Sequence, residues 1–304
     1  MSTVIAASGA QFSYGDTIIF SDLNVSVASG EVLCLLGANG CGKTTFLRCL
    51  AGYLHLQAGN ILLNGADIKH MAAGVVARRI AFVFQDNVAS FPYTVLEVVR
   101  MGRAPHLSFF ASPGAEDTRI AERALENVGV AHLKDKRFTQ ISGGERQLVV
   151  IARALAQEAE VIIMDEPTSA LDFKNQTLVL RLIRKLAAQG LTIVMSSHFP
   201  NNALLFSTRV ALMHKGRFIA VGNPNEVIDE ANLGEIYGME VKMLSATEPG
   251  SGRPLHFVIP AADPMDSEQP TPNHAAAPVQ RDVQASRTCS RSQEPGPAPC
   301  SSPD

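Results

Sequence analysis

The chain has 304 residues, of which 46% are hydrophobic and 18% are charged. This is enough for one α/β domain of good size with a modest second lobe, and it argues against several separate domains. The formal net charge is −3 and the Lys and Arg residues are scattered, so no basic face indicates DNA or RNA as a partner.

The cysteine spacing and the hydropathy argue against a zinc-binding, disulfide-rich, secreted or membrane-spanning protein. The cysteines form no CxxC pair and have no neighbouring His cluster, so neither a zinc site nor a disulfide framework is predicted, and a reducing cytosol fits. The start of the chain lacks the features of a signal peptide, and no later run approaches the roughly 18 apolar residues that span a bilayer. If the protein works at a membrane, we expect another subunit to hold it there.

The predicted elements begin with short strands between residues 3 and 32. The stretches "AASGAQFSYG", "TIIF" and "LNVSVASG" alternate apolar with polar residues and are separated by Gly, Asp and Asn turns, which predicts a half-buried antiparallel sheet. "EVLCLLG" is apolar at nearly every position, as a strand buried on both faces would be, and it runs into the helical spacing of "ANGCGKTTFLRCLAGYL". "RIAFVFQD", "VIIMDEP" and "LTIVMSSH" repeat the pattern of a strand followed by a polar turn. A parallel sheet with functional residues at the carboxyl ends of its strands is predicted.

Helices are predicted between Gln85 and Val161. "TVLEVV" opens with a capping box from Thr94 to Glu97, and "EDTRIAERALENVGV" is amphipathic at a period of 3.6. After Gly222 we expect two short helices, then a hairpin of "VKMLS" and "LHFVI", then a tail too poor in large apolar residues to fold. The expected boundaries are 1–245 for the main domain with a helical subdomain at about 88–159, 246–260 for the C-terminal hairpin and 261–304 for a disordered tail.

The clearest motif is "GANGCGKT", from Gly37 to Thr44, which has the P-loop pattern G-x-x-x-x-G-K-[ST] between a buried strand and a helix. Glycines let backbone N–H groups turn around a phosphate, and the helix N-terminus adds partial positive charge. Lys43 is expected to reach the outer phosphates of a nucleotide, and the Thr44 hydroxyl to ligate Mg²⁺.

Other predicted strands also end in polar side chains. "VIIMDEP" delivers Asp165 to the metal and Glu166 to a position suited to polarise an attacking water. Gln85 is suited to contact Mg²⁺ or water, and His198 to contact the terminal phosphate. Taken alone, Gln85 or His198 could be an ordinary polar residue at the end of a strand. Because both follow predicted strands of the same sheet, we favour a common site.

"ISGGERQLVVIARAL", from Ile141, indicates a second anion site. Ser142 and Glu145 have the spacing of a capping box, which leaves Gly143 and Gly144 unexplained, since each glycine inside a helix costs roughly 1 kcal/mol relative to alanine. Close approach of a ligand to bare N–H groups at a positive helix end explains them. Yet the chain has only one P-loop.

The motifs "GANGCGKTT", "ISGGERQ", "VIIMDEPTSALD" and "SSH", in this order, resemble those of the ATP-binding cassette ATPases over about residues 3–239. The resemblance implies an α/β P-loop NTPase core with a mostly parallel sheet, an N-terminal antiparallel β subdomain and an inserted helical subdomain. In that family two cassettes dimerise head to tail, and the signature sequence of one closes over the ATP held by the P-loop of the other. A homodimer that uses ATP and Mg²⁺ is therefore implied, with the second anion site serving the nucleotide of the partner.

The resemblance also assigns roles to residues. Tyr14 matches the aromatic that stacks on adenine, Gln85 the Q-loop glutamine and His198 the switch histidine. Catalysis is expected from Glu166, His198 and Gln85, and magnesium ligation from Thr44, Gln85 and Asp165. The expected nucleotide-binding residues are Tyr14, Gly37, Asn39, Gly40, Gly42, Lys43, Thr44, Thr45, the signature residues Ser142, Gly143, Gly144 and Glu145, and Asp172 of the D-loop at 169–172.

Two local features depart from the common pattern. The usual "LSGGQ" reads "ISGGE" here, and a carboxylate near phosphates should weaken binding unless Glu145 turns back to cap its own helix, which we favour. Cys41 lies within the P-loop, where a helix N-terminus should lower the pKa of its thiol and make it open to alkylation, with ATP protecting it.

The helical subdomain is where we expect the protein driven by the ATPase to bind. The stretch "SFPYTVLEVVRMGRAPHLSFFASP" carries Phe91, Tyr93, Phe109 and Phe110, more large apolar side chains than a small lobe needs for its own core. "MGRAPH" and "SHFPNNALLF" resemble the ATPase subunits of importers for ferric siderophores, haem and cobalamin. The resemblance implies integral membrane permease subunits as partners, indirectly a substrate-binding protein, and a peripheral position on the cytoplasmic face of the cell membrane.

Other functions stay open at this point. The related importers for molybdate and tungstate look similar in these segments. A soluble cassette ATPase that serves DNA repair, the ribosome or iron–sulfur assembly is a rival, as is a regulatory protein that holds ATP without turnover. The filled catalytic positions argue against the last.

Overall fold

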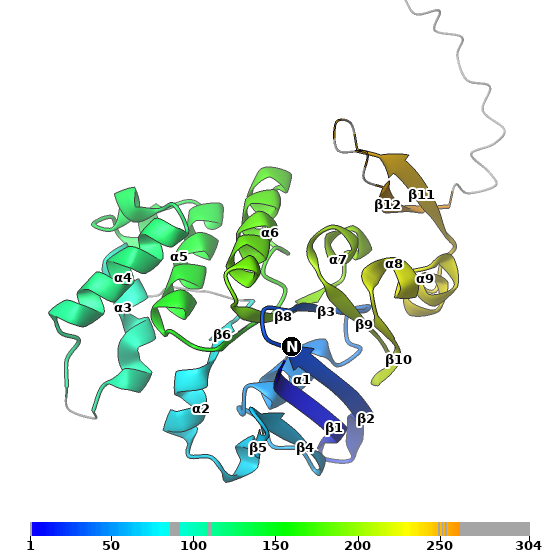
Figure 1. The fold of residues 1–304 in the computed structure, drawn as a ribbon, viewed down its shortest axis with the longest axis horizontal. Helices are drawn as coiled ribbons and strands as arrows, with labels where there is room; N and C mark the ends of the chain where they lie inside the picture. Colours follow the sequence, from blue (N-terminus) through cyan, green and yellow to red (C-terminus); the bar gives the residue numbers. More distant parts are fainter. Residues whose placement is uncertain are drawn as a thin grey trace, which may run out of the picture. The chain divides into compact units, whose positions relative to one another are not determined.

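The computed structural model describes residues 2–85, 92–108, 111–248, 250, 252 and 254–261. These residues form a four-stranded sheet in the order β2-β1-β4-β5, a six-stranded sheet in the order β10-β9-β3-β8-β7-β6, and a hairpin of β11 and β12 (Figure 1). The strands are β1 Thr3–Tyr14, β2 Thr17–Ala28, β3 Val32–Leu36, β4 Ala58–Leu63, β5 Ala66–Asp67, β6 Ile80–Val83, β7 Val161–Met164, β8 Thr192–Ser197, β9 Arg209–His214, β10 Arg217–Gly222, β11 Val241–Thr247 and β12 Pro254–Pro260.

Along the chain, most helices follow a strand of the six-stranded sheet. The α-helices are α1 Lys43–Leu50, α2 Ala73–Arg79, α3 Val95–Arg100, α4 Ala115–Asn127, α5 Gly143–Ala156, α6 Phe173–Ala188, α7 Pro200–Phe206, α8 Pro224–Val227 and α9 Glu230–Tyr237. Short 3₁₀ turns are η1 Ile68–His70, η2 Met101–His106, η3 Ala131–Leu133 and η4 Phe138–Gln140.

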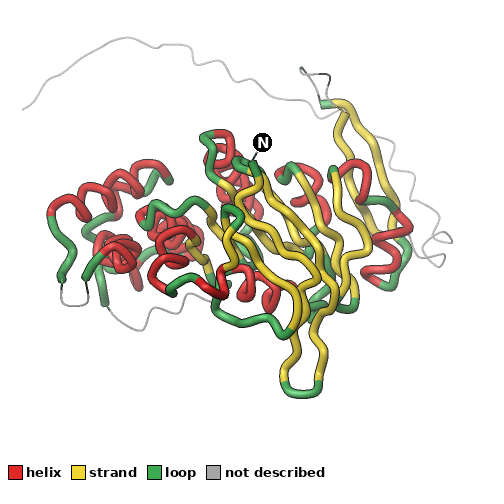
Figure 2. The backbone as a smooth tube through the Cα atoms, turned by 60° about the horizontal axis from the view of Figure 1, so that its bottom comes forward, coloured by secondary structure: helices red, strands yellow, loops and turns green. Residues whose placement is uncertain are grey.

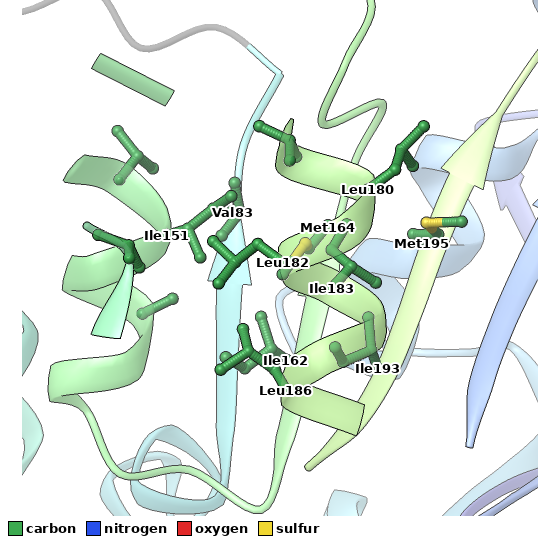
Figure 3. Close-up of a cluster of buried hydrophobic side chains, with 14 of the residues drawn as sticks. Val83, Ile151, Ile162, Met164, Leu180, Leu182, Ile183, Leu186, Ile193 and Met195 are labelled. Atoms are coloured by element: carbon green, nitrogen blue, oxygen red, sulfur yellow. The ribbon is translucent and has the colours of Figure 1, made fainter. Parts of the chain in front are cut away.

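The six-stranded sheet is parallel except for β10, which pairs antiparallel with β9. All five residues of β3 are buried, and they alternate between two hydrophobic cores: Cys34 and Leu36 belong to the core on the side of α5 and α6, and Leu33 and Leu35 to the core shared with α1 and the antiparallel sheet. Figure 3 shows part of the first core, where Ile162 of β7 lies close to Leu186 of α6. Burial on both faces explains the nearly unbroken apolar sequence of these strands.

The antiparallel sheet has longer strands than the sequence predicts. "TIIF" and "LNVSVA" belong to one strand, β2, and the expected turn between them is a distortion within it. Asp22 has φ 54°, and the Asn24 side-chain amide donates to the Asp22 carbonyl oxygen at 2.9 Å while its oxygen accepts from Gly9 N at 2.8 Å. The prediction of a chain turn at this point is therefore wrong, because the polar pair builds a bulge instead.

Residues 92–108 and 111–159 supply the helices α3, α4 and α5, which form the helical lobe between β6 and β7 (Figure 2). The predicted capping box opens α3: Thr94 Oγ1 accepts from Glu97 N at 3.2 Å, and Glu97 Oε2 accepts from Thr94 N at 2.7 Å. Arg103 links the lobe internally, with Nε 3.0 Å from Asp117 Oδ1 and Nη1 2.8 Å from the Ala156 carbonyl oxygen at the end of α5. Phe91, Phe109 and Phe110 lie outside the described residues.

After β10 the chain forms α8, α9 and the β11–β12 hairpin, whose strands contain "VKMLS" and "LHFVI". The Asn201 side chain of α7 holds β12 by donating to Val258 O at 3.1 Å and accepting from Val258 N at 2.7 Å. Of the tail expected at 261–304, Ala261 is described and its N–H donates to the Glu240 carbonyl oxygen at 3.1 Å, whereas 262–304 lie outside the described residues.

The expected fold class is confirmed: a mostly parallel sheet flanked by helices, an N-terminal antiparallel sheet and a helical insertion. Among the described residues, no helix combines the length and the apolar character that crossing a bilayer requires.

Candidate functional site

The P-loop connects β3 to α1 and encloses the amine of Lys43. Lys43 is only 5% exposed, and its Nζ donates to the carbonyl oxygens of Gly37 at 2.8 Å and Ala38 at 3.0 Å. Nζ also lies 3.8 Å from Glu166 Oε1. The buried cation is therefore held inside its own loop by carbonyl dipoles and one carboxylate.

Two of the P-loop glycines are needed for different reasons. A Cβ at Gly37 would come within 2.4 Å of the Met213 carbonyl oxygen on β9, so side chains larger than hydrogen are excluded there. Gly40 has open space around it but adopts φ 79°, a left-handed conformation that disfavours other residues. The first glycine seats the loop against the sheet, and the second turns the loop back toward α1.

Asp165 and Glu166 follow β7 and are tied to the neighbouring strand β8 through Ser196. The Ser196 hydroxyl donates to Asp165 Oδ1 at 2.7 Å and accepts from Glu166 N at 2.8 Å. Ser196 is 1% exposed and Asp165 is 3% exposed. A single buried hydroxyl thus fixes the positions of both acidic residues.

Glu166 has a strained backbone and a polar environment. Its φ is 45°, which is uncommon for a residue other than glycine, and such conformations are concentrated at functional sites. Ser169 helps to hold it, since both its N–H and its hydroxyl donate to the Glu166 carbonyl oxygen at 3.2 Å. The carboxylate Oε2 lies 3.1 Å from Nδ1 of His198, which directly follows β8.

A pocket of about 360 Å³ joins these elements. Its described lining consists of Ile19, which was not predicted, and of predicted site residues: Asn39, Gly40, Gly42, Lys43, Thr44, Thr45, Gln85 and Glu166. A larger cavity of about 590 Å³ lies among α4, α5 and the end of α6, and its lining contains none of the predicted site residues. The smaller pocket is therefore the candidate site, because charged and polar groups converge there.

The donor set of the pocket suits a magnesium ion bound together with phosphates. Mg²⁺ is bound by one or two protein oxygens plus phosphates and waters rather than by a full protein cage. The Thr44 hydroxyl and the Gln85 amide line the pocket, and Asp165 lies beside Glu166 with one carboxylate oxygen oriented by Ser196. Within the described residues no cluster of three or more His, Cys, Asp or Glu side chains could replace the phosphates as ligands.

The signature stretch begins α5 with a reciprocal capping box. Ser142 Oγ accepts from Glu145 N at 3.3 Å, and Glu145 Oε2 accepts from Ser142 N at 2.8 Å and from Ser142 Oγ at 2.7 Å. These hydrogen bonds lower the pKa of Glu145. The interpretation that Glu145 caps its own helix is confirmed.

The two signature glycines have different surroundings. Gly143 is exposed and a Cβ there would meet nothing within 4 Å, which agrees with a surface left open for a ligand. Gly144 is buried, and a Cβ there would lie 2.4 Å from Cγ of Asn175 on α6. Packing against α6 is thus a second reason for the small size of Gly144, and the approach of a ligand stays a prediction at both glycines.

Several predicted residues lie apart from the pocket lining. Tyr14 is 48% exposed at the end of β1, where its ring packs edge-on against Phe12 at a centroid distance of 4.8 Å. Asp172 caps α6, accepting from Asn175 N at 2.8 Å. Neither these residues nor the signature serine and glycines line the pocket of the same chain.

Cys41 contradicts the prediction of a reactive thiol. It is 9% exposed, and burial raises the pKa of its thiol above the ordinary value, with the nearby charge of Lys43 acting only as a smaller, opposing influence. Desolvation therefore outweighs the helix N-terminus, and the thiol stays protonated near neutral pH.

Two residues with roles in this region were missed. Ser196 was visible in "SSH" as a polar residue near the end of a strand, and this position was the available signal. Tyr237, whose hydroxyl donates to the His198 carbonyl oxygen at 2.9 Å, carried no local signal because the contact joins α9 to the end of β8.

Comparisons with known proteins show what this chain is similar to. A family model described as ABC transporter matches residues 20–169. The iron(3+)-hydroxamate import ATP-binding protein FhuC of Bacillus subtilis is 37% identical over 243 residues, which cover 80% of this chain and 90% of that protein. The molybdate import ATP-binding protein MolC of Haemophilus influenzae is 37% identical over 223 residues, covering 73% and 83% of the two chains. A solved structure described as a metal-chelate type ABC transporter in an inward-facing conformation superposes with a TM-score of 0.77 at 33% identity, covering 86% of this chain and 98% of that chain.

Proposed function

This chain belongs to the ABC transporter family of ATPases, and from that premise we propose that it is the ATP-hydrolysing subunit of an importer for a metal chelate such as a ferric siderophore, haem or cobalamin. The observation that carries the proposal is the single pocket in which Lys43 and Thr44 of the P-loop meet Gln85 and Glu166. The permease would be a separate chain, and this subunit would work on the cytoplasmic face of the membrane through it.

The residues of the chain divide the work of hydrolysis. The P-loop N–H groups and Lys43 would bind the phosphates of ATP, and Tyr14 would stack on adenine. Thr44, Gln85 and Asp165 would hold Mg²⁺, which when bound neutralises charge on the phosphates. Glu166 would orient the attacking water and His198, 3.1 Å from its carboxylate, would contact the terminal phosphate.

A second copy of the chain would complete the site. The hydroxyl of Ser142 and the exposed Gly143 stand at the N-terminus of α5, where backbone N–H groups favour an anion. Because these groups do not line the pocket of their own chain, we assign them to the ATP held by the partner in a head-to-tail homodimer. Two ATP molecules would then be bound between the protomers.

An aromatic cluster beside Gln85 suits the docking of a permease helix. Phe84 precedes Gln85 and stacks on Tyr53 at a centroid distance of 5.8 Å, and Tyr53 also packs against Phe82 at 5.5 Å. Tyr53 is 56% exposed and Phe84 is 38% exposed, although both are large apolar rings. Tyr93, at the start of the helical lobe, is exposed as well. Such a patch next to a nucleotide-contacting glutamine would let closure of the ATPase dimer move the permease.

The transported substrate is inferred from the relatives of this chain, because the ATPase site itself does not contact that substrate. An importer for molybdate or tungstate is the second candidate, favoured by the 37% identity to the molybdate protein. The metal chelate is preferred because the iron(3+)-hydroxamate protein matches over a larger share of the chain and the metal-chelate type transporter superposes on it. We expect deletion of the gene to abolish uptake of one labelled metal chelate (ferric siderophore, haem or cobalamin) and to leave molybdate uptake unchanged.

The experiment that tests the transporter proposal is copurification. The tagged full-length chain is recovered from detergent-solubilised membranes of its host, and bound proteins are identified by mass spectrometry while ATPase activity is assayed. We expect a polytopic membrane protein to copurify with the unmodified chain and to be lost with the Tyr53→Asp variant. Leu244→Asp is the control, because it places a charge at a similarly exposed residue of the C-terminal hairpin, and it should still recover the membrane protein. Active hydrolysis with recovery only from the soluble fraction would favour a soluble ABC ATPase instead.

A further inference from the structure

The backbone around His198 is held by side chains on both sides. β8 ends at Ser197, whose hydroxyl accepts from Phe199 N at 3.0 Å. The hydroxyl of Tyr237, the last residue of α9, donates to the His198 carbonyl oxygen at 2.9 Å. The His198 backbone is therefore fixed by its own strand end and by an element that follows it by 39 residues.

The segment that carries Tyr237 is itself anchored at several points. Gly238 ends α9 with φ 66°, and the chain continues directly into the hairpin. Glu230 of α9 accepts from Met243 N at 2.8 Å, so α9 and β11 are joined. Asn201, three residues after His198, exchanges two hydrogen bonds with Val258 of β12. Residues 230–248 and 254–260, which we call the C-terminal clasp, thus contact the chain at His198 and just beyond it.

The position of the His198 ring depends on this backbone. The ring is 27% exposed, and its described polar partner is Glu166, through the contact of 3.1 Å between Nδ1 and Oε2. The ring of Phe199 lies 4.0 Å away between centroids. Because the ring and the carbonyl belong to one residue, rotation of the peptide group between His198 and Phe199 would shift the backbone from which the imidazole projects.

We propose that Tyr237 is a positioning residue of the ATPase reaction, which through its hydrogen bond to the His198 carbonyl oxygen keeps the imidazole within reach of Glu166 and of the terminal phosphate. The inference rests on the proposed role of His198 in hydrolysis. It gives the C-terminal clasp, which lies outside the part of the chain that the family model matches, a function in turnover.

The hydroxyl rather than the ring of Tyr237 carries this role. Burial raises the pKa of Tyr237, so the hydroxyl stays protonated at neutral pH and remains a donor to the carbonyl oxygen. Removal of the hydroxyl leaves the ring to fill the same space against its neighbours. Tyr237→Phe therefore separates positioning from packing.

The test measures steady-state ATP hydrolysis by the full-length chain. We expect Tyr237→Phe to lower kcat by about five- to tenfold, the kinetic equivalent of one hydrogen bond, while KM for ATP stays close to that of the unmodified chain and the melting temperature falls by about 2–4 °C at most. Ser207→Ala removes a hydroxyl that donates to the Ala203 carbonyl oxygen at the other end of α7, and this control should leave kcat unchanged. In a His198→Ala background, Tyr237→Phe should have no further effect, because the group that it positions is gone.

The possible results separate the inference from the function on which it rests. If His198→Ala itself leaves kcat unchanged, the role proposed for His198 is wrong, and the inference falls with it. If His198→Ala lowers kcat but Tyr237→Phe does not, only the inference is overturned. A Tyr237→Phe effect on kcat that persists undiminished in the His198→Ala background would also overturn it in favour of a structural role.

Discussion

Gly144 of α5 and Asn175 of α6 are packed so closely that a Cβ on Gly144 would lie 2.4 Å from Cγ of Asn175. The neighbouring Gly143 has open space around it. Gly144→Ala should therefore push the Asn175 side chain aside, and because that side chain can rotate we expect a loss of at most about 1 kcal/mol of stability, whereas Gly143→Ala should fold normally and lose ATPase activity. Thermal unfolding and ATP hydrolysis of the two variants check this.

A second substitution tests the cause of the Gly144 effect. Gly144→Ala combined with Asn175→Ala should recover much of the lost stability, since the clashing amide is removed. A Gly144→Ala variant with an unchanged melting temperature and no activity would instead support the approach of a ligand as the reason for this glycine.

Ser196 should matter for both stability and magnesium use. Ser196→Ala leaves the Glu166 N–H without its hydrogen-bond acceptor and removes the donor to Asp165, so we expect the free energy of unfolding to fall by about 1–3 kcal/mol. The magnesium concentration that gives half-maximal hydrolysis should rise, because Asp165 is no longer oriented. Titration of activity with magnesium, with Ser207→Ala as the control, measures this, and an unchanged magnesium curve would argue against the assignment of Asp165.

Glu145 should act as a helix cap that glutamine can replace. Glu145→Gln keeps the acceptor for the Ser142 N–H and should leave stability nearly unchanged, whereas Glu145→Ala should lose about 0.5–1 kcal/mol. The hydrogen bonds from Ser142 lower the pKa of Glu145 in the folded protein. The stabilisation by the ionised Glu145 is therefore fully present above the pKa that this residue has in the unfolded chain, and it is lost as the pH falls through the lower pKa of the folded state. The gap in stability between the wild type and Glu145→Ala should shrink in acid, and a gap that is constant with pH would contradict this account.

Cys41 should be slow to alkylate in the folded protein. Burial raises the pKa of its thiol, so at pH 7.5 the reactive thiolate is scarcer than for an exposed cysteine, and labelling should accelerate only as the pH rises toward the raised pKa. Peptide mapping after treatment with N-ethylmaleimide, with guanidinium-unfolded protein as the control, measures this at Cys41 itself. Labelling of the folded and unfolded chains at equal rates would show that burial does not protect the thiol.

The pattern of the sequence predicted most of the fold because the responsible interactions are local. Unbroken apolar runs such as "VLCLL" identify strands that are buried on both faces, and the capping box from Thr94 to Glu97 marks the start of α3. The break expected within residues 17–28 was wrong because Asp22 and Asn24 form a bulge that depends on a hydrogen bond to Gly9 of the neighbouring strand. A contact between strands of this kind leaves no mark in a short window of sequence.

The candidate site divides in the same way. Lys43, Gln85, Glu166 and His198 could be chosen because each follows a recognisable strand. The role of Tyr237 could not be predicted, since it depends on where α9 returns to the end of β8. The pKa of Cys41 was predicted in the wrong direction because its position in the P-loop is visible in the sequence and its burial is not.

The central claim is that two copies of this chain enclose ATP and that Glu166 drives its hydrolysis. Glu166→Gln with ATP and magnesium, followed by size-exclusion chromatography with light scattering and by assays of bound nucleotide and released phosphate, tests it most directly. We predict a stable ATP-bound dimer whose turnover is lower by about 10²- to 10⁴-fold, with Glu235→Gln, an exposed carboxylate of α9, behaving as the wild type. Normal hydrolysis by Glu166→Gln, or a monomer that retains ATP without turnover, would contradict the account.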